Sequence, residues 1–246
     1  MTNMLKVSLL LAATLAVAAC DSGTSTAAPA GKAADAAKSS PAARDWTQTV
    51  VETPEGGYRM GNPDAKVKVV EFASFTCSHC RDFHKEAETT FKPTYVKTGQ
   101  VSYEYRPFML NVYDFAAVKL ATCEGPSRFF TWANELYTHS DAWITPFTKL
   151  TEADVAPLRA LPPGEQIKGL ATAGQLHEFA KTRGLPRAKF DGCMSDQKTL
   201  DTLTARQQAA VDKFQVQGTP TFLLNGKKLE GVANWATLEP KLKEAL

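Results

Sequence analysis

Three stretches of the chain have the apolar pattern of β-strands: residues 66–75, 101–107 and 219–230. In the first stretch the apolar residues form a nearly continuous run, which is typical of a central strand buried on both faces. The last stretch contains Asn225-Gly226 between two apolar segments, which is the strongest short signal for a β-hairpin. We therefore expect a sheet whose last two strands form a hairpin.

The apolar spacing changes to that of helices between the second and third stretches. We expect Gly184 to end one of these helices and Ser195 to cap the next one. Leu238 and Leu242, one helical turn apart, indicate a closing helix at the C-terminus. The predicted order is strand, helix, strand, several helices, hairpin and helix, which places the chain in the α/β class.

The first part of the chain is expected to lie outside this fold. Residues 1–19 carry a single charge, Lys6, followed by an apolar run that is too short to span a bilayer, which indicates a secretory signal peptide. Residues 20–44 contain no aromatic and no large aliphatic side chain, so we expect them to form a disordered tether. Packing is expected to begin at Trp46.

The end of the apolar run adds an expectation about the membrane. Residues 17–20 (VAAC) resemble the lipobox of bacterial lipoproteins, in which the signal peptide is cut off before a cysteine that is then acylated. This resemblance implies lipidation of Cys20, and Asp21 resembles an inner-membrane retention signal. We therefore expect an inner-membrane lipoprotein on the periplasmic side. The alternative is ordinary cleavage near Ala18 or Ala19, which would leave a free exported protein.

Composition narrows the classes of function. The chain is 43% hydrophobic and 22% charged, which is typical of a globular protein. Its net charge of +2, from 28 Lys and Arg against 26 Asp and Glu, argues against a dedicated nucleic-acid binder. The roughly 200 residues after the tether suffice for one domain with an insertion.

The clearest chemical signal is Cys77-Ser78-His79-Cys80, which directly follows the first predicted strand. Apolar residues at helical spacing follow it, and we expect Pro93 to limit that helix. Cys77 would then lie at a helix N-terminus, where free backbone N–H groups and the helix dipole favour a thiolate. A protonated His79 would favour the thiolate further. The pattern predicts a redox-active disulfide that is easily reduced.

Three other interpretations of the same motif compete with this one. A structural disulfide across two residues would gain little from chain entropy. A zinc site would need four ligands, and the sequence has no second CxxC motif. A c-type haem site needs His directly after the second Cys, where this chain has Arg81. We therefore favour redox chemistry, and we expect no metal and no organic cofactor.

Residues 61–63 (GNP), 70–75 (VEFASF) and 77–80 (CSHC) together resemble the DsbA family of thioredoxin-fold oxidoreductases. Residues 218–221 (GTPT) resemble that family's cis-proline loop, and the two motifs lie about 140 residues apart, as in DsbA-like proteins. The resemblance implies a thioredoxin fold with a helical domain inserted between its βαβ and ββα halves.

The implied boundaries are a thioredoxin-like domain made of residues 45–113 and 212–246, and an inserted helical domain made of residues 114–211. Trp132, Trp143 and the neighbouring Phe129 and Phe130 are expected to fill the helical core. The isolated residues His84, His139 and His177 are expected on the surface or on a helix face.

The resemblance also implies roles for four residues near the motif. Cys77 would be the exposed nucleophile that forms a mixed disulfide with a substrate, and Cys80 the buried resolving cysteine. His79 would tune the reduction potential. Glu71 would be a buried acid that handles the proton of the buried cysteine, and its apolar neighbours in the sequence favour burial.

Thr219 and Pro220 would bind the substrate, because an extended substrate segment can pair with the backbone of the cis-proline loop. Threonine before this proline also occurs in isomerase relatives, which leaves oxidase versus isomerase open. Those isomerases carry an N-terminal dimerisation domain, whereas this chain has the predicted tether at that position, so the oxidase is favoured.

The remaining cysteines, Cys123 and Cys193, lie 70 positions apart in the predicted insertion. Cys123 is expected to end the first inserted helix, and Cys193 to precede the helix capped by Ser195. Some DsbA-like proteins carry a second disulfide in that domain, so the resemblance implies a structural disulfide here. Two buried free thiols are the alternative.

The sequence therefore predicts a periplasmic dithiol oxidase that introduces disulfides into exported proteins through Cys77 and Cys80. The expected partners are folding exported proteins with free thiols and a DsbB-like membrane quinone reductase that reoxidises the pair. We expect a monomer that does not bind nucleic acid. The alternatives are an isomerase or reductase of the same fold, or a non-catalytic peptide-binding lipoprotein or chaperone.

Overall fold

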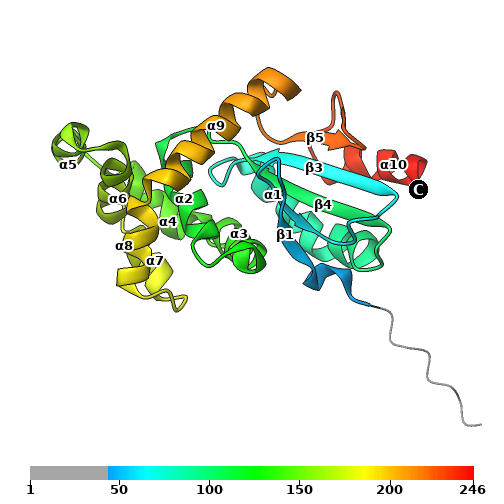
Figure 1. The fold of residues 1–246 in the computed structure, drawn as a ribbon, viewed down its shortest axis with the longest axis horizontal. Coiled ribbons are helices and arrows are strands. Elements are labelled where there is room, and N and C mark those ends of the chain that lie inside the picture. The colour runs from blue at the N-terminus through cyan, green and yellow to red at the C-terminus, as the bar shows by residue number, and fades with distance from the viewer. Residues whose placement is uncertain (1–43) are drawn as a thin grey trace, which may run out of the picture. The chain divides into compact units, whose positions relative to one another are not determined.

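The computed structural model describes residues 44–246 (Figure 1). The predicted signal peptide (1–19), the lipidation site Cys20 and the tether up to residue 43 lie outside the described residues. Arg44, the last residue of the predicted tether, already contacts the fold: its guanidinium lies 4.0 Å from the ring centre of Trp46.

The described strands form one six-stranded sheet with the order β1-β2-β4-β3-β5-β6. Only β3 and β4 are parallel, and the other neighbours are antiparallel. The strands are β1 (Val50–Glu52), β2 (Tyr58–Met60), β3 (Val67–Ala73), β4 (Val101–Pro107), β5 (Thr221–Leu224) and β6 (Lys227–Lys228). β3 therefore lies inside the sheet between β4 and β5, as its apolar run predicts.

The strand predictions are confirmed with small changes at the ends. The predicted 101–107 strand is β4 itself, and the predicted 66–75 strand is shorter, at Val67–Ala73. Asn225 and Gly226 have positive φ angles of 49° and 81° and join β5 to β6 as the predicted hairpin. β1 and β2 were not predicted, because three-residue strands are too short to show a period in the sequence.

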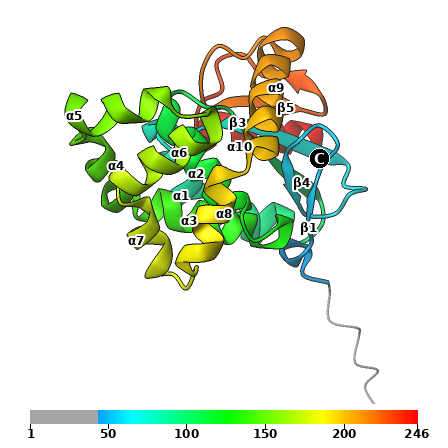
Figure 2. The same cartoon turned by 60° about the vertical axis from the view of Figure 1, so that its left-hand side comes forward.

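The helices follow the predicted order, with seven α-helices between β4 and the long helix α9 that leads back to β5 among the described residues. Figures 1 and 2 show α4–α8 gathered on one side of the molecule and the sheet on the other. The α-helices are α1 (Ser78–Glu86), α2 (Val112–Thr122), α3 (Phe129–Thr138), α4 (Ser140–Thr148), α5 (Glu152–Val155), α6 (Pro163–Ala173), α7 (Leu176–Lys181), α8 (Arg187–Ser195), α9 (Gln197–Phe214) and α10 (Trp235–Ala245). The other helical segments are the 3₁₀ turns η1 (Trp46–Gln48), η3 (Pro126–Arg128) and η4 (Ala156–Ala160) and the π-helix η2 (Ala87–Val96).

The sheet and the inserted helices share one hydrophobic core. Phe75, which follows β3, stacks on Tyr105 of β4 and also contacts Phe129 and Tyr137 of α3. The prediction that the aromatic residues of the insertion fill a core is confirmed, because Phe129, Phe130, Trp132 and Trp143 are all buried. Since the core is continuous, the insertion is packed against the region that carries the cysteine motif.

The expectation that Pro93 limits the first helix is wrong. The helix that begins as α1 continues through Pro93 as the π-helix η2, which ends at Val96. A proline removes one amide donor and crowds the preceding turn of an α-helix. The wider π-type turn relieves that crowding, and such turns commonly mark irregular sites within helices.

Ser195 does not cap a helix as predicted. It is the last residue of α8, and its hydroxyl donates a hydrogen bond to the carbonyl of Asp191 at 2.9 Å. Asp196 caps α9 instead, because its carboxylate accepts a hydrogen bond from the backbone N–H of Lys198 at 3.1 Å. Cys193 lies within α8 and still precedes the next helix, α9, as predicted.

His84 is buried on the face of α1 that contacts α3, so it takes the expected helix-face position and not the surface. Its ring lies 4.8 Å from the ring of Tyr137 and contacts the amide oxygen of Asn134 at 3.3 Å. Burial lowers the pKa of His84 to about 4. The spacing of apolar residues on α1 did not reveal this, because the covering helix α3 comes from a distant part of the chain.

Candidate active site

The two motif cysteines lie where β3 leads into α1. Cys77 is the N-cap residue of α1, with extended backbone angles, and Cys80 lies in the first turn. Cys77 is partly exposed and Cys80 is fully buried, and both are free thiols. This placement agrees with the sequence prediction of one accessible and one buried cysteine at a helix N-terminus.

The cis-proline loop lies directly against Cys77. The Thr219–Pro220 peptide bond is cis, and the thiol of Cys77 donates a hydrogen bond to the carbonyl oxygen of Thr219 at 3.3 Å. The sheet brings the two segments together, because β5 begins at Thr221 and pairs with Phe72 of β3. The structure thus brings together Cys77, Thr219 and Pro220, as the sequence predicts.

The surroundings of Cys77 favour its thiolate. Its pKa is lowered to about 5, first of all by the hydrogen bond with the thiol of Cys80, although burial acts in the opposite direction. The side chain of Thr219 and the backbone N–H groups of Cys80 and His79 lower the pKa further. Cys80 behaves oppositely, because burial raises its pKa well above the ordinary value for a thiol. The pair therefore combines an accessible thiolate with a buried neutral thiol.

Glu71 lies on the central strand β3 and is 2% exposed, which confirms the predicted burial. Burial raises the pKa of Glu71 to about 8, against the effect of a hydrogen bond that the hydroxyl of Tyr103 donates to its carboxylate. A negative charge on Glu71 raises the pKa of Cys80 in turn. The acid and the buried thiol are therefore coupled through their charges.

His79 is exposed, on the first turn of α1. The contribution of this residue to the low pKa of Cys77 comes from its backbone N–H, which helps to form the helix N-terminus around the sulfur.

Two residues that the sequence analysis did not single out belong to the site. Tyr103 on β4 donates its hydroxyl to Glu71, and Asp114 on α2 accepts hydrogen bonds from the loop that precedes Cys77. The spacing of Asn111 and Asp114 is that of a helix-capping box, which would have indicated a helix start. No local signal predicts the position of Tyr103 beside Glu71.

The second cysteine pair is bonded. A disulfide joins Cys123 to Cys193, with their Cα atoms 5.6 Å apart. Cys123 is the C-cap residue of α2, as predicted, and its partner lies in α8. The bond therefore ties the first inserted helix to a later one within the insertion.

A hollow of about 400 Å³ adjoins the cysteine site on the side of the cis-proline loop. It is lined by residues 217–221 and by the segment 228–233 that follows the hairpin. The hydroxyl of Thr219 is buried and has no hydrogen-bond partner among the described residues. An extended peptide that enters this hollow would meet the backbone of Thr219 next to the sulfur of Cys77.

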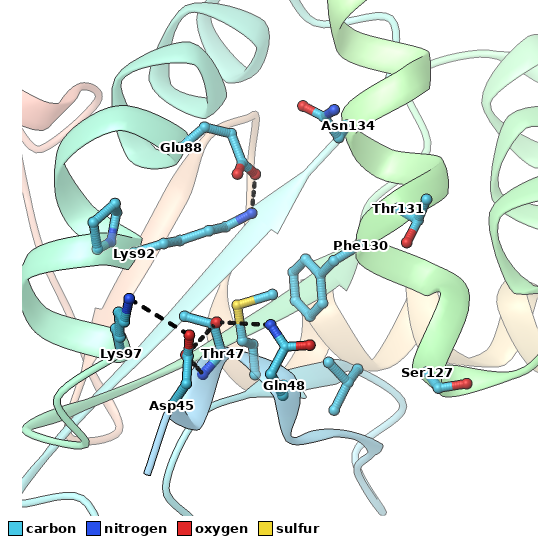
Figure 3. A pocket seen from close by; sticks show the side chains of 13 residues that line it. Asp45, Thr47, Gln48, Glu88, Lys92, Lys97, Ser127, Phe130, Thr131 and Asn134 are labelled. Carbon is cyan, nitrogen blue, oxygen red and sulfur yellow. Dashed lines mark hydrogen bonds and ion pairs between the residues drawn. The ribbon is translucent and has the colours of Figure 1, made fainter. Parts of the chain in front are cut away.

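A larger hollow of about 530 Å³ lies elsewhere, and Figure 3 shows its lining. The ammonium of Lys92 pairs there with the carboxylate of Glu88, while Lys97 approaches Asp45 to 3.7 Å. None of the residues of the cysteine site lines it. Burial lowers the pKa of Lys92. Because the Lys92 and Lys97 ammonium groups in this hollow are both paired with carboxylates, we assign the hollow no role.

Two further findings concern residues 44–246 only. No group of three or more His, Cys, Asp or Glu side chains in this range is arranged to hold a metal ion. Within the same range, every helix is either too short or too polar to cross a membrane.

Known proteins with a similar sequence or structure also have the thioredoxin fold. The family profile described as Thioredoxin matches residues 53–244. The crystal structure of a protein-disulfide isomerase from Novosphingobium aromaticivorans is 32% identical, with a TM-score of 0.71 over 76% of this chain and 95% of that chain. The α-DsbA1 of Wolbachia pipientis, at 22% identity, shows the same fold with a TM-score of 0.62 over 79% of this chain and 92% of that chain.

The curated relatives that match in sequence carry names of the same kind. A Rickettsia bellii protein whose name provisionally describes it as a protein-disulfide oxidoreductase is 28% identical over 172 residues, which is 70% of this chain. The chain spans 58% of the length of that relative. The chain belongs to the thioredoxin family, and its fold is that of the DsbA-like proteins, a thioredoxin fold with a helical insertion.

Proposed function

We propose that the protein is a thiol:disulfide oxidoreductase that oxidises pairs of thiols in other proteins through Cys77 and Cys80. The observation that carries this proposal is the accessible Cys77 sulfur, which lies at the N-terminus of α1 and 3.3 Å from the carbonyl of Thr219. A low pKa stabilises the reduced form of such a pair relative to the disulfide, and this makes the disulfide a strong oxidant.

The first step would be attack by a substrate thiolate on the Cys77 sulfur of the Cys77–Cys80 disulfide. A bond forms between the substrate and Cys77, the bond to Cys80 breaks, and Cys80 leaves as a thiolate. Cys77 is the sulfur attacked because it is the accessible one of the two. Substrate backbone on either side of the attacking cysteine would pair with the cis-proline loop at Thr219 and Pro220.

The second step would be attack by another substrate thiolate on the substrate sulfur of the mixed disulfide. The substrate disulfide forms and Cys77 leaves as a thiolate, which its low pKa makes a good leaving group. Two electrons have then passed from two substrate thiols to the cysteine pair, which is left in the reduced form that the structure holds.

Glu71 would supply the proton that Cys80 needs after the first step. With its pKa raised to about 8, the carboxyl is mostly protonated at neutral pH, whereas the pKa of Cys80 is raised well above that of an ordinary thiol. Transfer of the proton from Glu71 to the Cys80 thiolate is therefore favourable. It also prevents the buried sulfur from attacking the mixed disulfide in the reverse direction.

Oxidation is the direction that the low pKa of Cys77 favours, since the reduced pair is the more stable one. Disulfide isomerisation is the second candidate, and the name of the 32% identical protein from Novosphingobium aromaticivorans supports it. An isomerase would act mainly with its pair reduced, and it would attack substrate disulfides through the Cys77 thiolate.

The setting of this activity is part of the proposal. The signal-peptide pattern of residues 1–19 and the lipobox at Cys20 support an exported protein anchored by lipid to the periplasmic face of the inner membrane. Its substrates would be exported proteins that still carry free thiols. A membrane quinone reductase resembling DsbB would reoxidise the pair, and the protein would act as a monomer.

Two assays on the whole chain test the function. Oxidation of a model peptide with two thiols should be fast with the oxidised protein and should fall to the background rate in Cys77→Ala. Recovery of activity from ribonuclease with scrambled disulfides measures isomerisation. Fast peptide oxidation with slow ribonuclease recovery supports the oxidase, the reverse supports the isomerase, and unchanged rates in Cys77→Ala would exclude both.

A further inference from the structure

The carboxylate of Asp114 is fully buried in the first turn of α2, at the start of the helical insertion. A buried carboxylate is costly unless it is hydrogen-bonded. In most capping boxes a residue at this position would bond back to the cap residue of its own helix. Asp114 reaches beyond its helix and accepts hydrogen bonds from the loop between β3 and Cys77.

The hydrogen bonds to Asp114 come from four donor groups. The backbone N–H and the hydroxyl of Thr76 donate at 3.1 and 2.9 Å, and the hydroxyl of Ser74 lies 2.9 Å from both carboxylate oxygens. The backbone N–H of Leu110 donates at 2.8 Å. Asn111, the cap residue of α2, donates its amide to the Thr76 hydroxyl at 2.8 Å. The loop before α1 and the loop before α2 are thus joined at one carboxylate.

This loop determines where Cys77 lies. The backbone N–H of Cys77 donates to the carbonyl of Ser74 at 3.2 Å, and the hydroxyl of Tyr137 in α3 donates to the same carbonyl at 3.0 Å. Cys77 directly follows Thr76, whose backbone N–H is held by Asp114. Two helices of the insertion therefore hold the three residues that lead to the nucleophile.

The position of the Cys77 sulfur matters because its low pKa depends on short-range donors. These are the thiol of Cys80, the side chain of Thr219, and the backbone N–H groups at the start of α1. A hydrogen bond to a charged group weakens steeply with distance and angle. A shift of the loop would move the sulfur away from these donors and raise its pKa.

We propose that Asp114 is a positioning residue for the cysteine pair, through which the helical insertion keeps the Cys77 sulfur at the N-terminus of α1. The inference rests on the proposed redox function and extends it to a residue that does not touch the reacting sulfurs. It assigns the insertion a part in setting the reactivity of Cys77, in addition to its packing.

If Asp114 acted only through its charge, its loss would shift the pKa of Cys77 in the opposite direction. The negative charge of Asp114 disfavours a second negative charge nearby, so loss of this charge alone would lower the pKa of Cys77. Loss of positioning raises that pKa. The two roles can therefore be separated by the direction in which the pKa of Cys77 moves.

The test is a pH titration of the thiolate absorbance of the reduced full chain, in the wild type, Asp114→Asn and Thr76→Val. Asp114→Asn removes the charge and places an amide against groups that donate. Thr76→Val keeps the charge and removes one donor. We expect the pKa of Cys77 to rise by about one unit in Asp114→Asn, and by a smaller amount in Thr76→Val, while Thr76→Ser keeps the wild-type value.

Asp154→Asn is the matched control. Asp154 accepts hydrogen bonds from the backbone N–H and the hydroxyl of Thr151, the same pair of groups that Thr76 offers to Asp114. It lies at α5, which Figures 1 and 2 place at the outer end of the helical insertion, away from α1. The pKa of Cys77 should not change in this variant.

Two outcomes would overturn the inference. A fall in the pKa of Cys77 in Asp114→Asn with no change in Thr76→Val would show an effect of charge alone. A lower melting temperature with an unchanged pKa in both variants would show a role in folding alone. If Asp114→Asn does not fold, the pKa of Cys77 in Thr76→Val is compared with that in Thr76→Ser. A higher pKa in Thr76→Val supports the inference, and equal values contradict it.

Failure of the proposed function would look different. In that case the wild-type protein itself would not oxidise thiols, whatever the pKa of Cys77 in the variants. If the wild type is active, the rate at which its oxidised pair is reduced by glutathione provides a second readout. This rate should fall in Asp114→Asn, because Cys77 becomes a poorer leaving group as its pKa rises.

Discussion

The Cys77–Cys80 pair and the Cys123–Cys193 pair have the same sulfur chemistry in very different surroundings. The first pair is two residues apart around a helix N-terminus, with one sulfur partly exposed and both thiols free. The second pair joins α2 to α8 across a sequence separation of 70, and it is bonded. Both belong to the same compact part of the chain.

The difference shows what makes a disulfide reactive or structural. A short loop gains little chain entropy when it closes, and nearby donors stabilise the thiolate of Cys77, so reduction of the first pair is favoured. A long loop gains much more from closure, and the second bond therefore serves stability. If Cys77–Cys80 is the reactive pair and Cys123–Cys193 the structural pair, substitutions at the two pairs should have different effects.

The largest expected effect is on activity. Cys77→Ala should reduce the rate of thiol oxidation by orders of magnitude, because it removes the sulfur that forms the mixed disulfide. The double variant Cys123→Ala/Cys193→Ala should keep most of that rate, since neither sulfur belongs to the active site. The measurement is peptide oxidation by stoichiometric oxidised protein. Equal losses in the two variants would contradict the assignment of the pairs.

Stability should respond in the opposite way. The double variant Cys123→Ala/Cys193→Ala should lose about 4 kcal/mol of unfolding free energy, the amount expected from closing a loop of this length. Denaturant unfolding of the wild type and the variant at one pH measures the difference. A loss below about 1 kcal/mol would mean that packing in the shared core, and not the bond, holds α2 to α8.

Glu71 allows a pH-dependent test of the active pair. Its pKa is raised from the ordinary 4.5 to about 8 in the folded state, so this group disfavours folding progressively as the pH rises from 4.5 to 8. Below pH 4.5 the carboxyl is protonated in both states and the effect vanishes. Glu71→Gln should remove the effect and be more stable than the wild type by roughly 3 kcal/mol at pH 7.

The same variant should slow the protonation of Cys80 after the first step, so that the Cys80 thiolate reverses this step more often and the mixed disulfide accumulates more slowly. The measurements are denaturant unfolding of the reduced protein across this pH range and the rate of mixed-disulfide formation. If the stability difference between Glu71→Gln and the wild type does not change with pH, the raised pKa of Glu71 is contradicted.

The smallest expected effect comes from the cis-proline loop. Thr219→Val removes a buried hydroxyl that helps to lower the pKa of Cys77 and has no hydrogen-bond partner among residues 44–246. The pKa of Cys77 should rise by less than about one unit, and the protein should not become less stable. Thr219→Ser retains the hydroxyl and should titrate like the wild type. A lower pKa of Cys77 in Thr219→Val would contradict the role of this hydroxyl.

Much of the fold and site could be predicted because the signals are local. The CSHC motif after an apolar strand, and the Gly218-Thr219-Pro220 loop before the hairpin, identify the two sides of the site. The burial of Glu71 follows from its apolar neighbours on β3. These features depend on residues that lie close together in the sequence.

The features that the sequence did not reveal depend on contacts between distant segments. Pro93 continues its helix because the turn widens to the π form, and His84 is buried because α3 covers it. Asp114 looks like an ordinary helix-start residue until the loop at Thr76 is packed against it. Spacing along one element does not show which other element will cover it.

The thiolate titration of Cys77 in the wild-type reduced protein tests the central claim most directly. Cys80 should not interfere, because burial raises its pKa well above that of an ordinary thiol, and Cys77→Ala provides the baseline. The account predicts a midpoint of about 5 that disappears in Cys77→Ala. A midpoint near the free-thiol value of about 8.5 would contradict it.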